Sequence, residues 1–336
     1  MKVLVTGCAG FVGSHLLKRL LAEGHEVVGV DDLNDYYSPT LKADRLKQLG
    51  IITSDMLSNI AQNGNFTFIK SGIEEQTLFD DVLKDFHFDK ICHLAAQAGV
   101  RYSLEQPHRY ITSNLIGFFN VIEYCRKNPQ ARLVYASSSS VYGKNTQMPY
   151  KESDRVDSPL SLYAATKKSD ELMAHAYSEL YGIETIGLRL FTVYGAWGRP
   201  DMAPFLFTDA IFKNETIKLF NKGKLERDFT YIDDIVEGLY LTLFNLPTTT
   251  KSQSKRFRIY NVGNSTPVNI EDFIQTIEDL TGLKAKRDYL PMQQGDVERT
   301  WADTTLIRND YGYQPKTDIK SGLQEFINWY REYYNQ

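Results

Sequence analysis

Two short stretches of the sequence hold residue types that could move a proton to and from a hydroxyl group. Ser137–Ser140 form the first stretch, and Tyr163 and Lys167 follow after a loop. A spacing of four places Tyr163 and Lys167 on one face of a helix, one turn apart. A neighbouring cation favours the phenolate and so lowers the pKa of a tyrosine from about 10 toward neutral pH, where it can accept a proton. A serine hydroxyl can hydrogen-bond the same substrate oxygen, so these residues predict a general base with a serine partner.

A Tyr-x-x-x-Lys pair is common, so this interpretation depends on the elements around it. The N-terminus reads as a buried parallel strand over Lys2–Thr6, a turn with Gly7, Gly10 and Gly13, and a helix through Leu16–Leu21. The first glycines let the backbone approach a pyrophosphate at the start of the helix, and the last allows close packing of the helix on the strand. This G-x-x-G-x-x-G spacing predicts a dinucleotide-binding loop.

The next predicted strand, Glu26–Val30, ends in Asp31 and Asp32. An acid at this place binds the ribose hydroxyls of a dinucleotide and repels a 2′-phosphate, which favours NAD over NADP. Both acids could instead be ordinary turn residues, but their position after the glycine turn favours a cofactor site. Ala95 and Ala96, at the end of another buried strand, are small enough for a cofactor to lie close, although tight helix packing would select the same residues.

Alternating strands and helices through residue 191 predict an α/β fold with a Rossmann-type, doubly wound parallel sheet. The strand Arg132–Ala136 delivers the serine run to the carboxyl edge of that sheet, where ligands bind in open α/β folds. We expect residues 1–191 to form an NAD-binding Rossmann domain, completed by parts of 228–262. We expect residues 192–336 to form mainly a smaller substrate-binding lobe.

Outside these elements the pattern is looser. We expect a helix over 108–126, a turn-rich loop over 192–200 and a helix over 203–212. The polar run 247–255 lacks periodicity and is predicted to be an exposed loop, and an aromatic helix is expected from Leu323 onward.

The composition is typical of a soluble globular protein, and no metal site is predicted. A net charge of -4 provides no overall field that would attract nucleic acid or an anionic membrane. Cys8, Cys92 and Cys125 have neither metal nor disulfide spacing, and the histidines show no ligand spacing. No apolar run reaches about 18 residues, and strand-like residues begin at Lys2, which leaves no room for a signal peptide. We therefore expect a cytoplasmic protein.

The joint pattern resembles the extended short-chain dehydrogenase/reductase superfamily over almost the whole chain. Within it, His93–Ser103, Thr192–Ala203 and Arg227–Asp234 resemble UDP-glucuronate 4-epimerases. The resemblance implies NAD-dependent C4 epimerisation of a UDP-sugar, UDP-glucuronate to UDP-galacturonate, through a transient 4-keto intermediate. It also implies a tightly bound NAD that is regenerated in each cycle and a homodimer paired through the helices that carry Asn114 and Tyr163.

The resemblance further assigns residues to roles. It makes Tyr163 the catalytic base and Ser138 the substrate-facing serine, while Lys167 favours ionisation of the phenol and holds the nicotinamide ribose. The implied cofactor-binding residues, besides Tyr163 and Lys167, are Gly7, Gly10, Phe11, Val12, Gly13, Asp31, Asp32, Asn34, Ile73, Ala95, Ala96, Gln97 and Asn114. The implied substrate-binding residues are Arg101, Ser138, Ser139, Ser140, Thr192, Arg199, Arg227, Asp296 and Arg299.

Some positions depart from patterns common among relatives. Gly72 stands where many carry an acid near the adenine, and Gln293 stands where UDP-galactose-type epimerases use an arginine. Ser139 and Ser140 replace the Asp-Glu pair with which nucleotide-sugar dehydratases eliminate water, which favours epimerisation. A sugar carboxylate needs a partner, and Arg199 or Arg101 could provide it, although each could equally contact the diphosphate or lie on the surface.

Three alternatives remain open from the sequence. The first is a UDP-glucose/UDP-galactose 4-epimerase. The second is a nucleotide-sugar dehydratase or decarboxylase. The third is a regulatory protein that senses NAD without turnover, although such proteins usually lose the tyrosine or the lysine, and both are present here.

Overall fold

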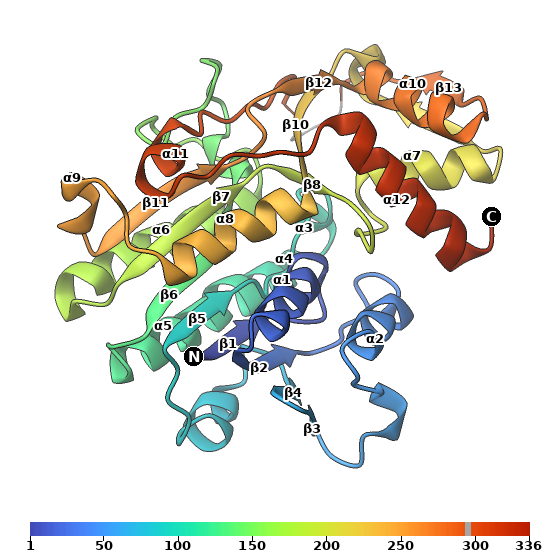
Figure 1. Ribbon diagram of the computed structural model, residues 1–336. Coiled ribbons are helices and arrows are strands. Elements are labelled where there is room, and N and C mark those ends of the chain that lie inside the picture. The colour runs from blue at the N-terminus through green and yellow to red at the C-terminus, as the bar shows by residue number, and fades with distance from the viewer. Residues whose placement is uncertain (293–296) are drawn as a thin grey trace.

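The computed structural model describes residues 1–292 and 297–336, and an eight-stranded sheet lies at its centre (Figure 1). Its strands are β1 (Lys2–Thr6), β2 (Glu26–Asp31), β3 (Ile60–Asn63), β4 (Phe66–Lys70), β5 (Lys90–His93), β6 (Arg132–Ser138), β7 (Thr185–Leu190) and β11 (Phe257–Val262). They lie in the order β11-β7-β6-β5-β1-β2-β4-β3, and each neighbouring pair is parallel except β3 with β4. The order reverses between β1 and β5, which confirms the predicted doubly wound Rossmann-type sheet.

The strands at the middle of the sheet are apolar because they are covered on both faces. Val3, Leu4 and Val5 of β1 are fully buried, as are Val27 and Val28 of β2. Continuous apolar runs of this kind are typical of parallel strands between two helix layers. The antiparallel edge strand β3 lacks this signal because its residues are mostly exposed, and the sequence analysis did not predict it.

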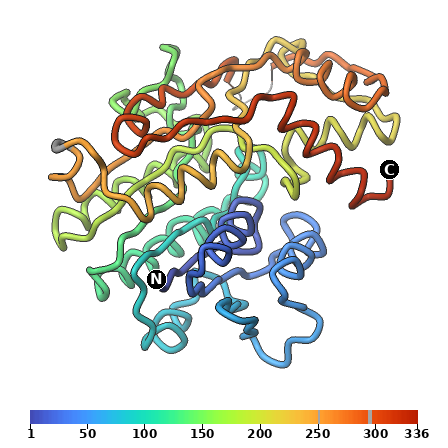
Figure 2. The backbone as a smooth tube through the Cα atoms, in the orientation of Figure 1, coloured from blue at the N-terminus to red at the C-terminus, as the bar shows by residue number. Residues whose placement is uncertain are grey.

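Two further groups of strands lie beyond the carboxyl edge of the large sheet. β8 (Thr192–Tyr194), β10 (Glu226–Tyr231) and β12 (Pro267–Asn269) form a three-stranded sheet, and β9 (Thr216–Leu219) pairs with β13 (Lys286–Tyr289). Figure 2 shows that the blue-to-teal first part of the chain fills the lower half of the view and that the yellow-to-red last part fills the upper half. The carboxyl edge of the large sheet therefore faces a second layer of structure.

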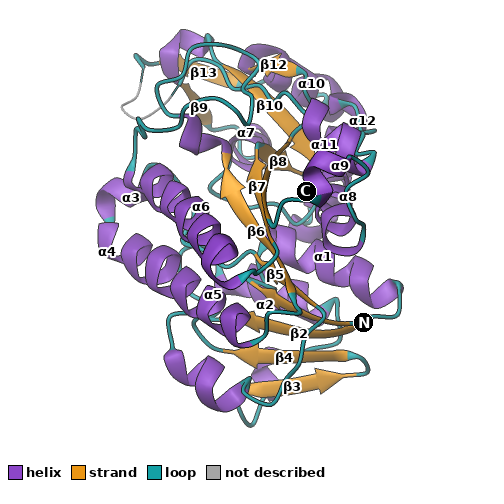
Figure 3. Ribbon diagram, turned by 90° about the vertical axis from the view of Figure 1, so that its left-hand side faces the viewer, coloured by secondary structure: helices purple, strands orange, loops and turns teal. Residues whose placement is uncertain are grey.

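Helices cover both faces of the large sheet (Figure 3). α1 (Phe11–Ala22) and α8 (Ile232–Phe244) pack together on one face, and α5 (Gly117–Lys127) and α6 (Leu162–Tyr181) pack together on the other. The remaining helices and turns are α2 (Pro39–Lys47), η1 (Thr53–Asp55), η2 (Leu78–Val82), α3 (Tyr102–Glu105), α4 (Pro107–Tyr110), η3 (Ile111–Ile116), η4 (Ser139–Tyr142), α7 (Ala203–Phe212), η5 (Phe220–Gly223), α9 (Thr250–Gln253), α10 (Ile270–Thr281), α11 (Thr305–Tyr311) and α12 (Ile319–Tyr334).

Several predicted elements are confirmed and others need correction. The helix expected over 108–126 is present as α4, η3 and α5 in succession, and α7 occupies the predicted 203–212. The expected loop 192–200 begins with β8, whose pairing with β10 is a contact that local sequence does not reveal. The expected loop 247–255 contains the single turn α9. The last helix begins at Ile319 because Asp318 caps it by accepting a hydrogen bond from the Ser321 amide.

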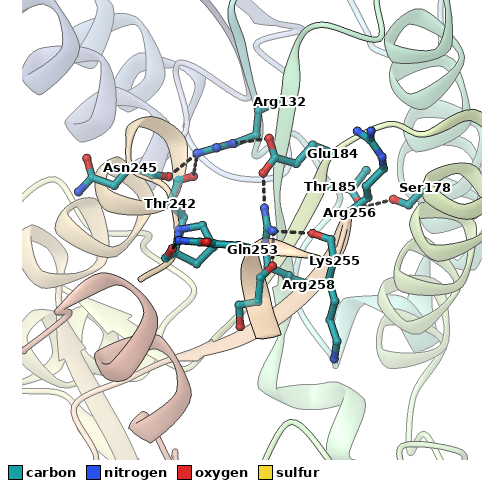
Figure 4. Close-up of polar contacts among 12 residues, drawn as sticks. Arg132, Ser178, Glu184, Thr185, Thr242, Asn245, Gln253, Lys255, Arg256 and Arg258 are labelled. Carbon is teal, nitrogen blue, oxygen red and sulfur yellow. Dashed lines mark hydrogen bonds and ion pairs between the residues drawn. The ribbon is translucent and has the colours of Figure 1, made fainter. Parts of the chain in front are cut away.

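A polar cluster fixes the amino-terminal edge of the sheet, opposite the carboxyl edge (Figure 4). The Glu184 carboxylate binds Arg132 of β6 at 2.9 Å and also binds Arg258 of β11. Arg132 in turn donates to the carbonyl oxygens of Thr242 and Asn245 at the end of α8. These bonds tie β6, β11 and the end of α8 to the residue that precedes β7. Within the described residues, Arg258 Nε is buried without a hydrogen-bond partner.

Within residues 1–292 and 297–336, no helix has both the length and the apolar character needed to cross a membrane. In the same part of the chain, no group of three or more His, Cys, Asp or Glu side chains is arranged to hold a metal ion.

Candidate active site

The glycine turn after β1 has the geometry of a phosphate-binding loop. Gly7 has a φ of +70°, and a Cβ there would lie 2.6 Å from the backbone nitrogen of Ala95. A Cβ on Gly13 would lie 2.1 Å from the carbonyl oxygen of Gly7, so only glycine permits this packing of α1 on the turn. Gly10 precedes α1, and no side chain caps the helix. The first amide groups of α1 are thus available to a pyrophosphate.

A cleft of about 170 Å³ lies beside this turn, where β1, β2 and β5 end. The predicted cofactor residues that line it are Gly7, Gly10, Phe11, Val12, Gly13, Asp31, Asp32, Asn34, Ile73, Ala95, Ala96 and Gln97. Asn114 does not line the cleft. Its side-chain amide accepts from the backbone N–H of Gln97 at 2.8 Å and donates to the carbonyl of Gln97 at 3.1 Å, so it fixes the position of that residue.

The acids at the end of β2 are held by backbone groups. Asp31 accepts hydrogen bonds from the amides of Ala9 at 3.0 Å and Leu33 at 2.9 Å, and burial raises its pKa. Asp32 accepts from the amide of Asn34 at 2.9 Å. Lys42, which the sequence analysis did not select, also lines the cleft, and its ammonium donates to the backbone and side-chain oxygens of Asn34. Two carboxylates therefore stand where a dinucleotide ribose would bind, and the nearby cation is already engaged.

Glu74 places a carboxylate beside Gly72, the position where many relatives carry an acid. The carboxylate of Glu74 lies 2.7 Å from the position that a Cβ on Gly72 would occupy, and both residues line the cleft. Burial raises the pKa of Glu74. An acid two positions along the chain from Gly72 therefore lines the cleft. Neighbouring acids in sequence were the signal that could have indicated it.

The serine run and the Tyr-Lys pair meet at the end of β6. Ser138 ends the strand, and its hydroxyl accepts from the amide of Ser140 at 3.1 Å. Ser161 caps α6 by accepting from the amide of Ala164, which places Tyr163 in the first turn of that helix.

A buried ionic cluster holds the serine run against α6. Ser137 donates to the carboxylate of Glu171 at 2.7 Å. Arg189 of β7 binds both oxygens of that carboxylate, at 2.8 and 2.9 Å. Burial disfavours the charge on Glu171, but the bonds from Arg189 and Ser137 outweigh it and lower its pKa. The cluster joins β6, β7 and α6 directly behind the residues that could act as base and hydrogen-bond donor.

A second cavity of about 930 Å³ opens in front of these residues and extends toward the smaller sheet. The predicted site residues that line it are Tyr163, Lys167, Ser138, Ser139, Ser140, Arg101, Thr192, Arg199 and Arg227. Phe11, Val12 and Arg199 line both this cavity and the cleft, so the two spaces are adjacent. A dinucleotide and a second ligand can therefore meet next to Tyr163.

The predicted arginines differ in their placement. Arg199 binds Asp201 through two hydrogen bonds, and the cation keeps the pKa of that acid below its usual value. Arg227 donates to the carbonyl oxygens of Glu226 and Glu298 at the wall of the cavity. Arg299 does not line the cavity and instead pairs with the Glu226 carboxylate.

The two remaining predictions concern Arg101 and Asp296. The guanidinium of Arg101 lies over the ring of Phe220, 4.8 Å from its centre, so this contact spans the mouth between the two layers of the molecule. Asp296, like Gln293, lies outside the described residues.

Comparisons with known proteins agree with this geometry. Residues 3–263 match the model of the NAD dependent epimerase/dehydratase family. The chain is 44% identical to UDP-glucuronate 4-epimerase 4 of Arabidopsis thaliana over 99% of its own length and 76% of the relative's.

Solved structures give the same result. A UDP-glucuronic acid 4-epimerase from Bacillus cereus, crystallised with UDP-glucuronic acid and NAD, is 31% identical with a TM-score of 0.87, covering 99% of this chain and 100% of the other. A UDP-glucose 4-epimerase from Thermotoga maritima, crystallised with UDP-glucose, is 25% identical with a TM-score of 0.86 at the same coverage. These matches confirm the resemblance inferred from the sequence motifs. The chain belongs to the NAD dependent epimerase/dehydratase family.

Proposed function

We propose that this protein converts UDP-glucuronate to UDP-galacturonate by NAD-dependent inversion at C4. It is an NAD-dependent nucleotide-sugar 4-epimerase. The observation that carries this conclusion is the placement of Tyr163, Lys167 and Ser138 in one cavity that adjoins the dinucleotide cleft. The Arabidopsis relative and the Bacillus structure, both named for UDP-glucuronate 4-epimerisation, support the choice of reaction and sugar.

The cleft beside Gly7 fits NAD. Glycine at positions 7, 10 and 13 permits the tight turn that leads into α1, whose first amides can bind a pyrophosphate, and Asp31 and Asp32 offer carboxylates to ribose hydroxyls. NAD held there would supply an acceptor and later a donor for the C4 hydride, with no net change in the cofactor. The chain itself must position the sugar and transfer the proton of the C4 hydroxyl.

Tyr163 and Ser138 carry that proton step. As the C4–H bond breaks, Tyr163 accepts the proton of the C4 hydroxyl and Ser138 hydrogen-bonds the same oxygen, which leaves a C4 carbonyl. When the hydride returns to the opposite face, Tyr163 gives the proton back to the oxygen. No net proton or electron is consumed. Lys167 would stabilise the phenolate form during the first step and would hold the cofactor ribose.

Inversion requires the keto sugar to present its other face. The cavity of about 930 Å³ lies at the upper end of the pocket sizes that hold ligands, which leaves room for the sugar to turn while the nucleotide stays bound. Arg227, at the wall toward the smaller sheet, is suited to the diphosphate. Thr192 and Leu219 line the same wall.

Arg199 is the residue we assign to the sugar carboxylate. It lines both the cleft and the larger cavity, and Asp201 fixes its orientation. Arg101 lies at the mouth against Phe220 and is the second candidate. A neutral UDP-hexose remains the alternative substrate, because the Thermotoga structure named for UDP-glucose is nearly as similar.

Elimination or decarboxylation is less well supported. The residues directly after Ser138 are Ser139 and Ser140, so no acid stands beside the serine to remove a proton from C5. The acids that line the cavity elsewhere include Asp201, which is occupied by Arg199 and Tyr36. Epimerisation needs no such acid.

Incubation of the purified protein with UDP-glucuronate, and separately with UDP-glucose, tests the substrate. We expect NMR to show a mixture of the two C4 epimers from UDP-glucuronate without added NAD. Faster conversion of UDP-glucose would favour the alternative substrate, and a 4-keto-6-deoxy product would identify a dehydratase. No conversion of any UDP-sugar would point to an NAD-sensing protein.

We propose that two copies of the chain pair through α5 and α6. Phe119 of α5, Leu172 of α6 and Ile116, which ends η3 directly before α5, are large apolar side chains left 46 to 59% exposed. α5 and α6 lie side by side on one surface (Figure 3). Covering such a face is worth about 25 cal/mol per Å². Light scattering should give a dimer mass, and Phe119→Asp with Leu172→Asp should give a monomer. A monomeric wild-type protein would contradict the pairing.

We also propose which part of the chain binds each ligand and in which compartment the protein works. Residues 1–191, with β11 and parts of 228–262, hold the cofactor, and residues 192–336 mainly hold the nucleotide sugar. The protein works in the cytoplasm, which is supported by Cys8, Cys92 and Cys125 all being free and buried.

A further inference from the structure

The ammonium of Lys167 has a buried acidic partner on its own helix. Asp170 Oδ2 lies 3.1 Å from Lys167 Nζ, and the two side chains are 0% and 3% exposed. The residues are three apart, so they face each other across one turn of α6. Tyr163 lies one turn before Lys167 on the same helix. Tyr163, Lys167 and Asp170 thus place a phenol, an ammonium and a carboxylate one after another along α6.

Asp170 has fewer hydrogen-bond partners than Glu171, the next residue in the sequence. Glu171 receives hydrogen bonds from Arg189, Ser137 and Lys168. For Asp170 the second oxygen, Oδ1, is buried and has no hydrogen-bond partner in the described part of the chain. Burying a carboxylate with one partner is costly, so Asp170 is a poor choice for stability alone. Such features are found where a site requires them.

The other groups that face Lys167 and Asp170 carry no charge that could substitute for either of them. Tyr135 of β6 and His93 of β5 are buried, and burial keeps both neutral: it raises the pKa of Tyr135 well above its usual value and lowers the pKa of His93 to about 3. Arg189 of β7 is engaged by Glu171. Asp170 is therefore the acid that directly opposes the Lys167 cation. Burial also raises the pKa of Asp170 to about 7, against the opposing effect of Lys167.

We propose that Asp170 is a positioning residue of the reaction: its carboxylate holds the Lys167 ammonium in place and offsets part of the positive charge that Lys167 applies to Tyr163. The inference rests on the proposed role of Tyr163 as the base. It assigns to Asp170 the control of how readily the phenol ionises. Asp170 touches neither the sugar nor the cofactor.

The sign of the effect follows from the charges. With Asp170 ionised, the cation beside Tyr163 is partly neutralised and the phenolate is less favoured. An amide at this position keeps an oxygen that can accept from Lys167 but removes the negative charge. The phenolate of Tyr163 should then form at lower pH.

An ultraviolet difference titration measures this directly. The absorbance of phenolate is followed with pH in the wild-type holoenzyme and in Asp170→Asn. From each curve, the curve of the matching protein that also carries Tyr163→Phe is subtracted, so that the remaining signal belongs to Tyr163. We expect the Tyr163 midpoint to fall by about one pH unit in Asp170→Asn. The acid limb of the kcat profile should move to lower pH by the same amount. Asp170→Ser, which also removes the charge, should shift the midpoint in the same direction if the amide fails to fold.

A control and the contrary outcomes complete the test. Asp80→Asn removes a carboxylate from the exposed pair with Lys127 and should leave the Tyr163 midpoint unchanged. An unchanged or raised midpoint in Asp170→Asn and Asp170→Ser, with NAD still bound, would overturn the proposal. The titration needs no sugar, so it distinguishes this failure from a failure of the epimerase assignment, which would appear as missing product in the NMR assay.

Discussion

At the scale of single residues, the proposed chemistry depends on one phenol in the first turn of α6. Tyr163 lines the cavity together with Lys167 and Ser138. The ring of Tyr110 packs edge-on against the ring of Tyr163, with 6.1 Å between the ring centres. The ring contact fixes the direction in which the hydroxyl points. Proton transfer at this group is therefore separable from binding of the cofactor and from folding.

Tyr163→Phe should lower kcat with UDP-glucuronate about 1,000-fold, because general base catalysis contributes of this order. The ring and its packing against Tyr110 are kept, so NAD should remain bound and the melting temperature should change little. Steady-state assays and the absorbance of co-purified NAD measure the two effects. A rate within about tenfold of the wild type would show that another group accepts the proton.

The sequence allowed some site residues to be predicted and not others. The glycines of the first turn and the Tyr-Lys pair were predictable because their spacing is local and their chemistry needs few other residue types. Lys42, Glu74 and Asp170 were not selected, because each acquires its role from a side chain or backbone group placed by the fold. Asn114 was selected as a cofactor contact, yet the structure places it behind Gln97.

At the scale of elements, α2 joins the cofactor turn to the loop that carries Arg199. Arg45 of α2 is 2% exposed and donates to the carbonyl oxygens of Ala9, in the glycine turn, and Trp197, in that loop. It also donates to the hydroxyl of Tyr37. The segment that contains α2 showed no chemistry in the sequence, since a buried arginine that binds only backbone carbonyls and a phenol has no motif.

Arg45→Met should therefore destabilise the fold by about 3 kcal/mol, because buried carbonyl groups lose their donors. It should also weaken both NAD and UDP-sugar binding, since the two loops lose their common anchor. Urea unfolding and calorimetric titration measure these effects. Lys47→Met, a charge removal at the end of the same helix, serves as the control. Unaltered affinity for both ligands in Arg45→Met would exclude the coupling.

The end of α10 offers a test of electrostatics away from the site. Glu278 accepts from the amide of Ala285 and from Arg287 and Lys284, and it is 3% exposed. Burial opposes its charge, but these bonds outweigh burial and lower the pKa of Glu278 from 4.5 to about 2. An acid whose pKa is lower in the folded protein than in the unfolded protein stabilises the fold at pH values above its unfolded pKa. That contribution is lost as the pH falls from about 4.5 toward about 2.

Glu278→Gln should cost about 1 to 2 kcal/mol of unfolding free energy near neutral pH, and the difference from wild type should shrink as the solution is acidified below pH about 4.5. Urea unfolding at a series of pH values measures it. Asp279→Asn changes an exposed acid that accepts from Gln275 on the same helix, and it should show no such trend. A difference that is constant with pH would mean that the charge of Glu278 is not what stabilises the fold.

At the scale of the whole molecule, the two parts of the chain are interleaved. α8 packs on α1 and covers one face of the large sheet, and β11 pairs with β7 along six residue positions. Both belong to the second half of the sequence. Alternation of strands and helices was enough to predict the large sheet. It could not show β3 or β8, because β3 is exposed and polar and β8 is defined by a partner far along the chain.

This interleaving predicts where the chain can be cut. A fragment of residues 1–191 lacks α8 and β11, so Leu188 and the buried apolar residues of α1 would face water, and we expect it not to fold. A fragment of residues 1–262 restores both elements and should regain cooperative unfolding and NAD binding, but not UDP-sugar binding. Circular dichroism on heating and NAD titration distinguish the two fragments. Cooperative unfolding of the shorter fragment would contradict the prediction, since it would show that the cofactor-binding part is complete without the second half of the chain.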